Sequence, residues 1–326
     1  MAARTLDQIG RRLRVRDLQI FLAVVEYGSM AKAAARLGVT QPAVSEVVAG
    51  LENTFGARLF DRSPRGIETT LYGRVLLGRT LTVLDELQQS AKDIAFLTDP
   101  TVGEIRIGCP DSIIGGFLPA VIKKFAIAYP GIALHVDLLS TPGLNLPPLR
   151  ARTVDLALTR LPRLDGQPNS DFDVEILFED EVVVAACARS RWARQRKITL
   201  THLAEAQWIL TAAAGTFSQD LIAEAFALNR LKAPKVIISS LSVHLRAHLL
   251  ANSEYVGTMP WSVFQANAKV FGLKMLPVKL PVRRLPVALV TLRNRTLSPV
   301  VELFIGHLRK QIGSATNQGL KHIPKS

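Results

Sequence analysis

Ser29 to Leu51 reads SMAKAAARLGVTQPAVSEVVAGL, and this stretch decides the fold of the N-terminal part of the chain. It predicts a short alanine-rich helix, a turn at Gly38 and a second helix, which together form a helix-turn-helix. Ser29 suits the N-cap of the first helix and Thr40 that of the second, whose first turn accommodates Pro42 because no amide donor is needed there. The alternative is an ordinary helical hairpin of a globular protein.

The two predicted helices each have an apolar and a polar face. The first carries small packing residues on one side, namely Ala31, Ala34, Ala35 and Leu37. The second has a buried stripe at helical spacing, formed by Val44, Val47, Val48 and Leu51. Gln41, Ser45 and Glu46 then remain on the outer face, at the end that such a helix inserts into the major groove of DNA.

A β-hairpin is predicted directly after this helix pair. Residues 59–70 contain Pro64 and Gly66 at the tip, with Arg62 and Arg65 beside them. The two arginines are suitably placed for the phosphate backbone. Helix pair and hairpin together predict an all-α winged helix-turn-helix domain that binds double-stranded DNA.

The segment from Arg16 to Gly73 resembles the N-terminal domain of LysR-type transcriptional regulators, and a looser similarity continues to about residue 310. The matching residues follow one another at uninterrupted spacing. They are Leu18, Phe21, Val24, Gly28, Ser29, Ala33, Ala34, Leu37, residues 39–45, Leu51, Glu52, Phe55, Gly56, residues 59–62, Tyr72 and Gly73. The resemblance implies a sequence-specific regulator with a two-lobed α/β effector domain, similar to periplasmic solute-binding proteins. It also implies tetramers.

The candidate DNA-binding residues combine the capping, recognition and phosphate-contacting positions. They are Ser29, Lys32, Arg36, Thr40, Gln41, Pro42, Ser45, Glu46, Arg62 and Arg65. One position departs from the family pattern, because the residue after Ser45 is often basic in these regulators and is Glu46 in this chain. Residues 40–51 contain no basic residue, so phosphate contacts fall to the other elements.

Residues 72–97 contain no proline and predict one long linker helix. Its apolar residues form two stripes at spacings of three, four and seven. The first holds Leu77, Leu81, Leu84 and Ala91, and the second holds Leu76, Val83, Leu87, Ile94 and Leu97. A helix with two apolar sides needs partners, which predicts a homodimer and a pseudo-palindromic DNA site.

Strands alternate with helices after residue 101, which predicts mainly parallel sheets with helices on both faces. The expected strands are 104–108, 133–139, 154–158, 181–185, 208–210, 236–238 and 287–290. We expect the crossovers between the lobes near residues 178 and 293. The expected domains are 1–73 (winged helix), 74–98 (linker and dimerisation helix), 101–178 with 294–312 (lobe 1), 179–293 (lobe 2) and 313–326 (flexible tail).

Ligands of open α/β sheets bind beyond the carboxyl ends of the strands, so the cleft between the lobes is the expected effector site. Polar residues follow several of the predicted strands there. The candidates are Ser112, Thr141, Thr159, Arg160, Thr216 and Phe217. Helix capping and turn chemistry explain the same residues equally well, because serine and threonine favour helix starts.

Composition limits the remaining functions. The net charge of +13 favours a polyanionic partner such as DNA, although it also suits anionic ligands. The two cysteines fit a reducing compartment, and no signal peptide or long apolar run is found, so a cytoplasmic protein without a membrane partner is expected. Nucleotide-loop and nucleophile-elbow motifs are absent. His244 and His248 have metal-compatible spacing but no third ligand, so we expect no enzyme, metal or cofactor.

The sequence therefore predicts a transcriptional regulator whose DNA binding or activation responds to a small molecule in the cleft, with organic anions among the candidates. Two alternatives remain open. One is an architectural DNA-binding protein without a ligand response, and the other is a solute-binding module or enzyme. Weak sequence preference in DNA binding favours the first alternative, and ligand binding without DNA binding favours the second.

Overall fold

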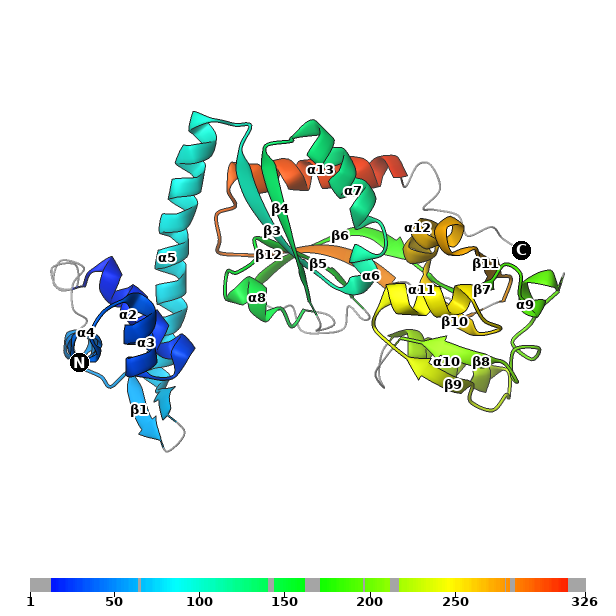
Figure 1. Cartoon of the computed structure of the whole chain (residues 1–326), viewed down its shortest axis with the longest axis horizontal. Helices are drawn as coiled ribbons and strands as arrows, with labels where there is room; N and C mark the ends of the chain where they lie inside the picture. Colours follow the sequence, from blue (N-terminus) through cyan, green and yellow to red (C-terminus); the bar gives the residue numbers. More distant parts are fainter. Residues whose placement is uncertain are drawn as a thin grey trace. The chain divides into compact units, whose positions relative to one another are not determined.

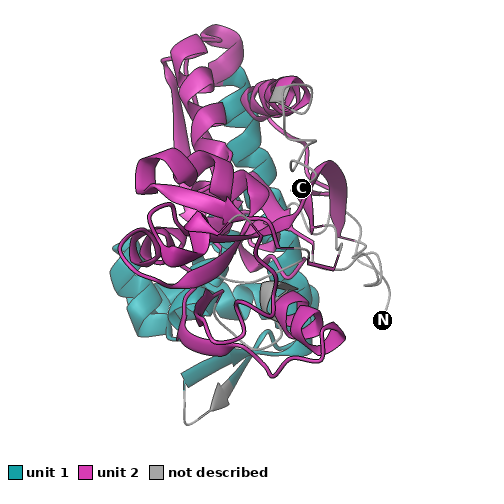
Figure 2. Ribbon diagram, turned by 90° about the vertical axis from the view of Figure 1, so that its right-hand side faces the viewer, with its two compact units in different colours: residues 1–94 teal, residues 95–326 magenta. Residues whose placement is uncertain are grey.

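The computed structural model describes residues 13–63, 66–139, 144–161, 171–195, 197–211, 217–278, 280–281 and 285–315. The chain divides into two compact units, residues 1–94 and 95–326, which are coloured separately in Figure 2. The first unit contains α2 (Val15–Tyr27), α3 (Met30–Leu37), α4 (Gln41–Phe55), β1 (Phe60–Ser63), β2 (Gly66–Thr69) and most of α5 (Leu71–Thr98) (Figure 1). The predicted helix pair, hairpin and long helix are confirmed. Most of the expected flexible tail lies outside the described residues.

The core of the first unit forms where α2, α3 and α4 meet. Phe21, Val24, Ala33 and Val44 are completely buried in it. On α3 the predicted packing face is correct at Ala34 but wrong at Ala31, Ala35 and Leu37, which are exposed, whereas Ala33 is buried. Alanines on several sides of a helix give no hydrophobic contrast, so only the contacts with α2 and α4 select the buried face.

The hairpin is fixed to the start of α5 at Gly73. The Thr70 amide donates to the Leu59 carbonyl, and the Gly73 amide donates to the Thr70 hydroxyl at 3.0 Å. A Cβ at Gly73 would lie 2.1 Å from the Leu59 oxygen, whereas a Cβ at Gly78, one turn and a half further along α5, meets nothing within 4 Å. Glycine is therefore required at the first position and not at the second.

We predict opposite effects of alanine at these two glycines. Gly73→Ala should destabilise the first unit by about 2–3 kcal/mol, because backbone must move to admit the methyl group. Gly78→Ala should be neutral or stabilise by up to about 1 kcal/mol through helix propensity. Hydrogen–deuterium exchange of α4 peptides measures the stability of the first unit in both variants. Equal exchange in the two variants would contradict the close contact between Gly73 and the Leu59 carbonyl.

The second unit contains two five-stranded mixed sheets. The first has the order β4-β3-β5-β12-β6 and the second β11-β7-β10-β8-β9. The strands are β3 (Gly103–Cys109), β4 (Ile132–Leu138), β5 (Leu156–Arg160), β6 (Phe172–Asp180), β7 (Val182–Cys187), β8 (Gln207–Leu210), β9 (Lys235–Ser239), β10 (Val256–Pro260), β11 (Leu273–Leu276) and β12 (Leu285–Leu292). In each sheet four strands run in one direction and one strand, β12 in the first sheet and β7 in the second, runs against them. Two neighbouring pairs in each sheet are parallel and two are antiparallel, so the prediction of mainly parallel sheets holds in part.

Helices cover both faces of each sheet. They are α6 (Asp111–Ile114), α7 (Leu118–Ala128), α8 (Pro147–Arg150), α9 (Arg191–Arg194), α10 (Phe217–Leu228), α11 (Val243–Ala251), α12 (Trp261–Phe271) and α13 (Pro299–Ala315). In lobe 1, α7 and α13 pack together on one face around Phe125 and Phe304, and α8 packs on the other (Figure 1). In lobe 2, α9 and α10 cover one face and α11 and α12 the other.

The second crossover between the lobes differs from the expected one. β12 pairs with β5 and β6 of the first sheet, so the strand expected at 287–290 belongs to lobe 1 rather than to lobe 2. The chain returns to lobe 1 between β11 and β12, before residue 285 and not near 293. An apolar strand buried on both faces gives no indication of which sheet it joins, so the sequence pattern could not place it.

Candidate nucleic-acid surface and ligand cleft

The start of α4 presents polar side chains to solvent. The Thr40 hydroxyl accepts a hydrogen bond from the Ala43 amide at 3.4 Å, as expected for an N-cap, and Pro42 occupies the first turn. Gln41, Pro42 and Glu46 are exposed, on the side of α4 away from the buried Val44. This turn therefore offers an accessible set of hydrogen-bonding groups.

Ser45 differs from its exposed neighbours on α4. Its side chain is half-buried, and its hydroxyl donates to the Met30 sulfur at 3.2 Å, which joins the start of α4 to the start of α3. The expectation of a fully outward Ser45 is therefore wrong in part. The sequence pattern places Ser45 on the outer face of α4, but the neighbouring helix α3 draws its side chain inward.

Exposed basic residues lie on α3, which precedes α4 in the chain, and at Arg58, which follows α4. Lys32 and Arg36 on α3 and Arg58 before the hairpin are exposed, and the Arg36 Nε donates to the Tyr27 hydroxyl at 3.2 Å. Ser29 caps α3 by accepting from the Lys32 amide at 3.5 Å. These cations supply the positive charge that α4 itself lacks.

The hairpin is held against the helices by polar and aromatic contacts. The Glu52 carboxylate accepts from the Leu59 amide at 2.7 Å, and the rings of Phe21 and Phe60 lie 5.2 Å apart. Arg62 pairs with Ile67 across the two strands. Arg65 and the side chain of Arg62, both predicted phosphate contacts, lie outside the described residues.

A buried ion pair of lobe 1 is hydrogen-bonded to lobe 2 through Ser262 on α12. Arg160, at the end of β5, donates from Nη1 to Asp180 at 2.8 Å, from Nε to the Ser112 hydroxyl at 3.1 Å and from Nη2 to the Ser262 hydroxyl at 3.0 Å. Ser262 also donates to Asp180, at 2.6 Å. Ser112 and Arg160, two predicted effector residues, are therefore together, but Asp180 already balances the charge of Arg160.

Lobe 1 also contacts the start of α11 in lobe 2. The Asp111 carboxylate accepts from the Val243 amide, and the Asn267 side chain on α12 donates to the Gly115 carbonyl at 2.7 Å. A Cβ at Gly115 would lie 2.9 Å from a methyl group of Val243, so the lobes touch closely there. These contacts join α6 of lobe 1, which contains the predicted effector residue Ser112, to α11 and α12 of lobe 2.

The other predicted effector residues are only partly described. Thr159 is 2 % exposed within β5, and Thr141 and Thr216 lie outside the described residues, as does the side chain of Phe217. Asp155, a residue of no assigned role, is 3.0 Å from Arg295 and accepts from the Arg106 amide, so it stabilises lobe 1. The sequence could not indicate these pairings, because the partners are 49 to 140 residues apart.

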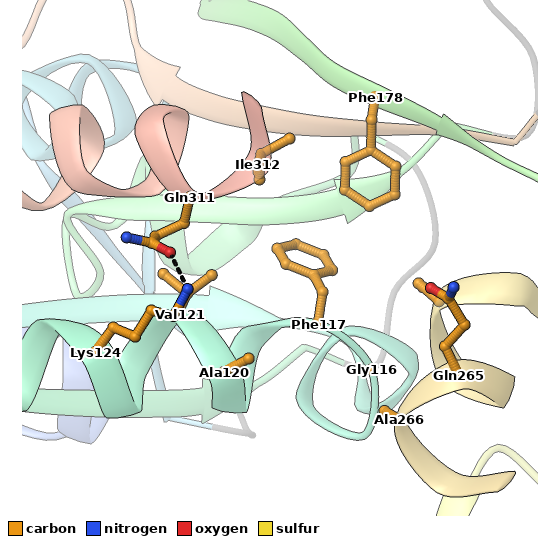
Figure 3. Close-up of a pocket in the computed structure, with 11 residues that line it drawn as sticks. Gly116, Phe117, Ala120, Val121, Lys124, Phe178, Gln265, Ala266, Gln311 and Ile312 are labelled. Atoms are coloured by element: carbon orange, nitrogen blue, oxygen red, sulfur yellow. Dashed lines mark hydrogen bonds between the residues drawn. The ribbon is translucent and has the colours of Figure 1, made fainter. Parts of the chain in front are cut away.

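A pocket of about 290 Å³ lies between α7, β6 and α13 of lobe 1 and α12 of lobe 2 (Figure 3). Phe117, Val121 and Phe178 make it largely apolar. At its rim Lys124 donates to Gln311 at 2.6 Å. Sequence reasoning missed this pocket, since its apolar residues are indistinguishable from ordinary core positions.

The geometry indicates neither a reactive cysteine nor a histidine metal site among the described residues. Cys109 is fully buried, and burial, together with the nearby Asp111, raises the pKa of its thiol to about 12. The rings of His244 and His248 stack on α11 with centroids 6.1 Å apart, beside Phe271. In the part of the chain that is described, no group of three or more potential metal ligands occurs, and no helix is long and apolar enough to cross a membrane.

Each of the two units matches a known protein family. Residues 15–74 match the family described as bacterial regulatory helix-turn-helix protein, lysR family, and residues 98–313 match the LysR substrate binding domain. An uncharacterized HTH-type transcriptional regulator of Escherichia coli K12, YdcI, is 26% identical over 303 residues, covering 93% of this chain and 97% of the relative. The transcriptional dual regulator GltC of Bacillus subtilis is 28% identical over 296 residues, covering 88% and 93%.

Solved structures have a similar fold. CbnR, a LysR family transcriptional regulator, aligns with a TM-score of 0.60 at 19% identity, covering 92% of this chain and 99% of CbnR. Full-length CbnR in complex with its target DNA aligns equally well, with a TM-score of 0.60 at 21% identity, covering 91% and 99%. At this level of identity the likeness concerns the fold, namely a helix-turn-helix, a linker helix and a two-lobed α/β domain.

Proposed function

The chain belongs to the LysR family of transcriptional regulators, which bind DNA and respond to small-molecule effectors, and we propose that it does so through α4 and through the cleft between its lobes. The observation that carries the DNA-binding part is the capped start of α4, where Gln41 and Glu46 are exposed beside the cations of α3. Chromosomal DNA as the ligand implies a cytoplasmic location. We propose no catalytic activity.

In the proposed complex α4 enters the major groove by its N-terminal end. Gln41 reads a base edge, and Glu46 accepts a hydrogen bond from the amino group of a cytosine. Ser45, half-buried against Met30, orients the helix more than it reads bases. Phosphate contacts come from the cations of α3 and of the hairpin, namely Lys32, Arg36, Arg62 and Arg65. The capped helix starts, at Ser29 for α3 and at Thr40 and Pro42 for α4, are proposed as further DNA contacts.

The proposed effector site lies between the lobes, where Ser112 of lobe 1 faces α11 and α12 of lobe 2. Thr141, Thr159, Thr216 and Phe217 remain proposed contacts. We propose that Arg160 acts through its bonds to Ser112, Asp180 and Ser262 rather than as a free cation, because Asp180 balances its charge. A ligand that binds one lobe arrangement more tightly than another shifts the population between them.

Two copies of the chain are proposed to pair through α5. Four of its apolar side chains, which we call the α5 stripe, are exposed: Val83, Leu87, Ile94 and Leu97. Leu76 and Leu77 instead pack on the core of the first unit. A dimer presents two copies of α4, so a pseudo-palindromic site is expected, and tetramers follow if a second interface forms.

We test this function by footprinting the purified protein on genomic DNA at physiological salt, with variants of α4. Gln41→Ala should lower affinity for the protected site by about tenfold or more, and Glu46→Ala should change which bases are preferred at one position, because each base contact contributes about 1–3 kcal/mol. Glu302→Ala, which removes an exposed glutamate on α13, is the matched control and should leave the footprint unchanged.

The outcome discriminates between specific and architectural binding. A protected pseudo-palindrome that is lost with Gln41→Ala establishes base reading by α4. Diffuse protection that neither variant changes would overturn the proposed function and favour an architectural DNA-binding protein. Replacement of Lys32 by alanine should weaken binding to all sequences alike and reduce the salt dependence, as phosphate contacts do.

A further inference from the structure

We propose that Arg246 on α11 is the anion-binding residue of the cleft and that the effector carries a carboxylate. The inference rests on the proposed ligand response and adds the chemical class of the ligand. The starting observation is that the buried guanidinium of Arg246, in lobe 2, has no carboxylate partner among the described residues.

Arg246 is a buried cation with neutral partners. Only 3 % of the residue is exposed, and its Nη1 donates to the Thr211 hydroxyl and to the Thr258 carbonyl, each at 3.0 Å. Its Nε is buried and has no hydrogen-bond partner in the described structure. A buried guanidinium normally has a carboxylate partner, since burial without one is costly.

Two other arginine side chains in the same unit show the usual arrangement. Arg295, with a side chain 2 % exposed, lies 3.0 Å from Asp155, and Arg160, with a side chain 9 % exposed, lies 2.8 Å from Asp180. Arg246 forms no ion pair with any described residue. Burial lowers the pKa of Arg246 to about 10, so the guanidinium remains protonated at neutral pH. The negative charge of Asp111 in lobe 1 raises this pKa by a smaller amount, without forming an ion pair with Arg246.

The position of Arg246 is where a ligand is expected. Thr211 follows β8 directly, and Thr258 lies in the parallel neighbour β10, so the guanidinium sits at the carboxyl ends of these strands. The Thr258 hydroxyl is also buried without a partner among the described residues. Residues 212–216, which follow Thr211 in the sequence, read Ala-Ala-Ala-Gly-Thr and include no acidic residue.

Lobe 1 contacts α11 one turn before Arg246. Asp111 accepts from the Val243 amide one turn before Arg246 on α11, and Gly115 lies against Val243. A ligand therefore reaches Arg246 when the lobes separate, and a carboxylate that binds there stabilises a different lobe arrangement from the one without ligand. This links the charge of the ligand to the conformation of the effector domain.

The test measures the melting temperature of the full-length protein at constant ionic strength with three acid and amide pairs: acetate and acetamide, succinate and succinamide, benzoate and benzamide. At least one acid should raise the melting temperature by about 2 °C or more while its amide does not, because ligand binding stabilises the folded state. Arg246→Gln should abolish the shift. Arg189→Gln, which removes an exposed cation of the same lobe, should retain it.

Arg246→Lys keeps the charge but not the planar fork, and should weaken the shift without abolishing it. This variant keeps the test decisive if Arg246→Gln loses its native circular dichroism spectrum. An equal response of wild type to acids and amides, or an undiminished acid shift in both Arg246 variants, would overturn the inference. A DNA footprint without ligand, recorded on the same samples, separates the two proposals. Specific DNA protection without any response to the acids refutes the carboxylate inference alone. Diffuse DNA protection refutes the proposed function.

Discussion

Replacing Asp180 by alanine is expected to destabilise the effector unit by about 3–5 kcal/mol. The side chain of Asp180 is 1 % exposed and accepts hydrogen bonds from Arg160, Ser262 and the Glu181 amide. Its removal leaves the Arg160 guanidinium buried without a counter-charge, which is the costly way to break such a pair. All three tryptophans, Trp192, Trp208 and Trp261, lie within residues 95–326, so tryptophan fluorescence during urea unfolding reports on this unit alone.

Asp173 on the same strand provides the control. It pairs with Arg293 at 3.0 Å, but the two side chains are 59 % and 48 % exposed. Asp173→Ala should therefore cost less than about 1 kcal/mol. The double variant Arg160→Met with Asp180→Leu should recover part of the stability lost in Asp180→Ala, because no buried charge remains unpaired. A loss for Asp180→Ala no larger than for Asp173→Ala would show that the ion pair does not stabilise the unit.

The local structure of the DNA-binding unit could be predicted because its signals are local. Ser29 and Thr40 cap their helices with hydroxyls that reach amides three residues ahead, and Gly38 adopts the left-handed conformation that ends α3. Each signal acts within one helical turn. What the sequence could not predict there was the buried side of α3, because its alanines differ too little in hydrophobicity.

The effector unit was less predictable because its organisation depends on distant contacts. β6, β10 and β11 were not anticipated, and β12 was assigned to the wrong lobe. Arg160 was identified as a polar residue after a strand, but its partners Ser112 and Ser262 are 48 and 102 residues away. No periodic pattern encodes such a pairing. Arg246 was missed for the same reason, since a single arginine on a predicted helix resembles a solvent-exposed residue.

The proposed pairing of two copies through the α5 stripe would explain why α5 leaves these apolar residues exposed. Leu87 is 50 % and Ile94 is 65 % exposed, and they are separated by seven residues, so both lie on one side of the helix. Burying this side against a second copy removes apolar surface from water, which favours association. The dimer then holds two copies of α4 together for a two-part DNA site.

The double change Leu87→Glu with Ile94→Glu is expected to convert the protein to monomers and to lower operator affinity by about 100-fold or more, because binding of the second α4 is no longer intramolecular. Light scattering after gel filtration gives the oligomeric state, and footprint titration gives the affinity. Gln88→Glu adds negative charge at an exposed neighbour of Leu87 and is the matched control, so it should leave both measurements unchanged. A double variant that remains a dimer would place the dimer contact on another surface, whereas monomers with full operator affinity would show that one α4 suffices for recognition.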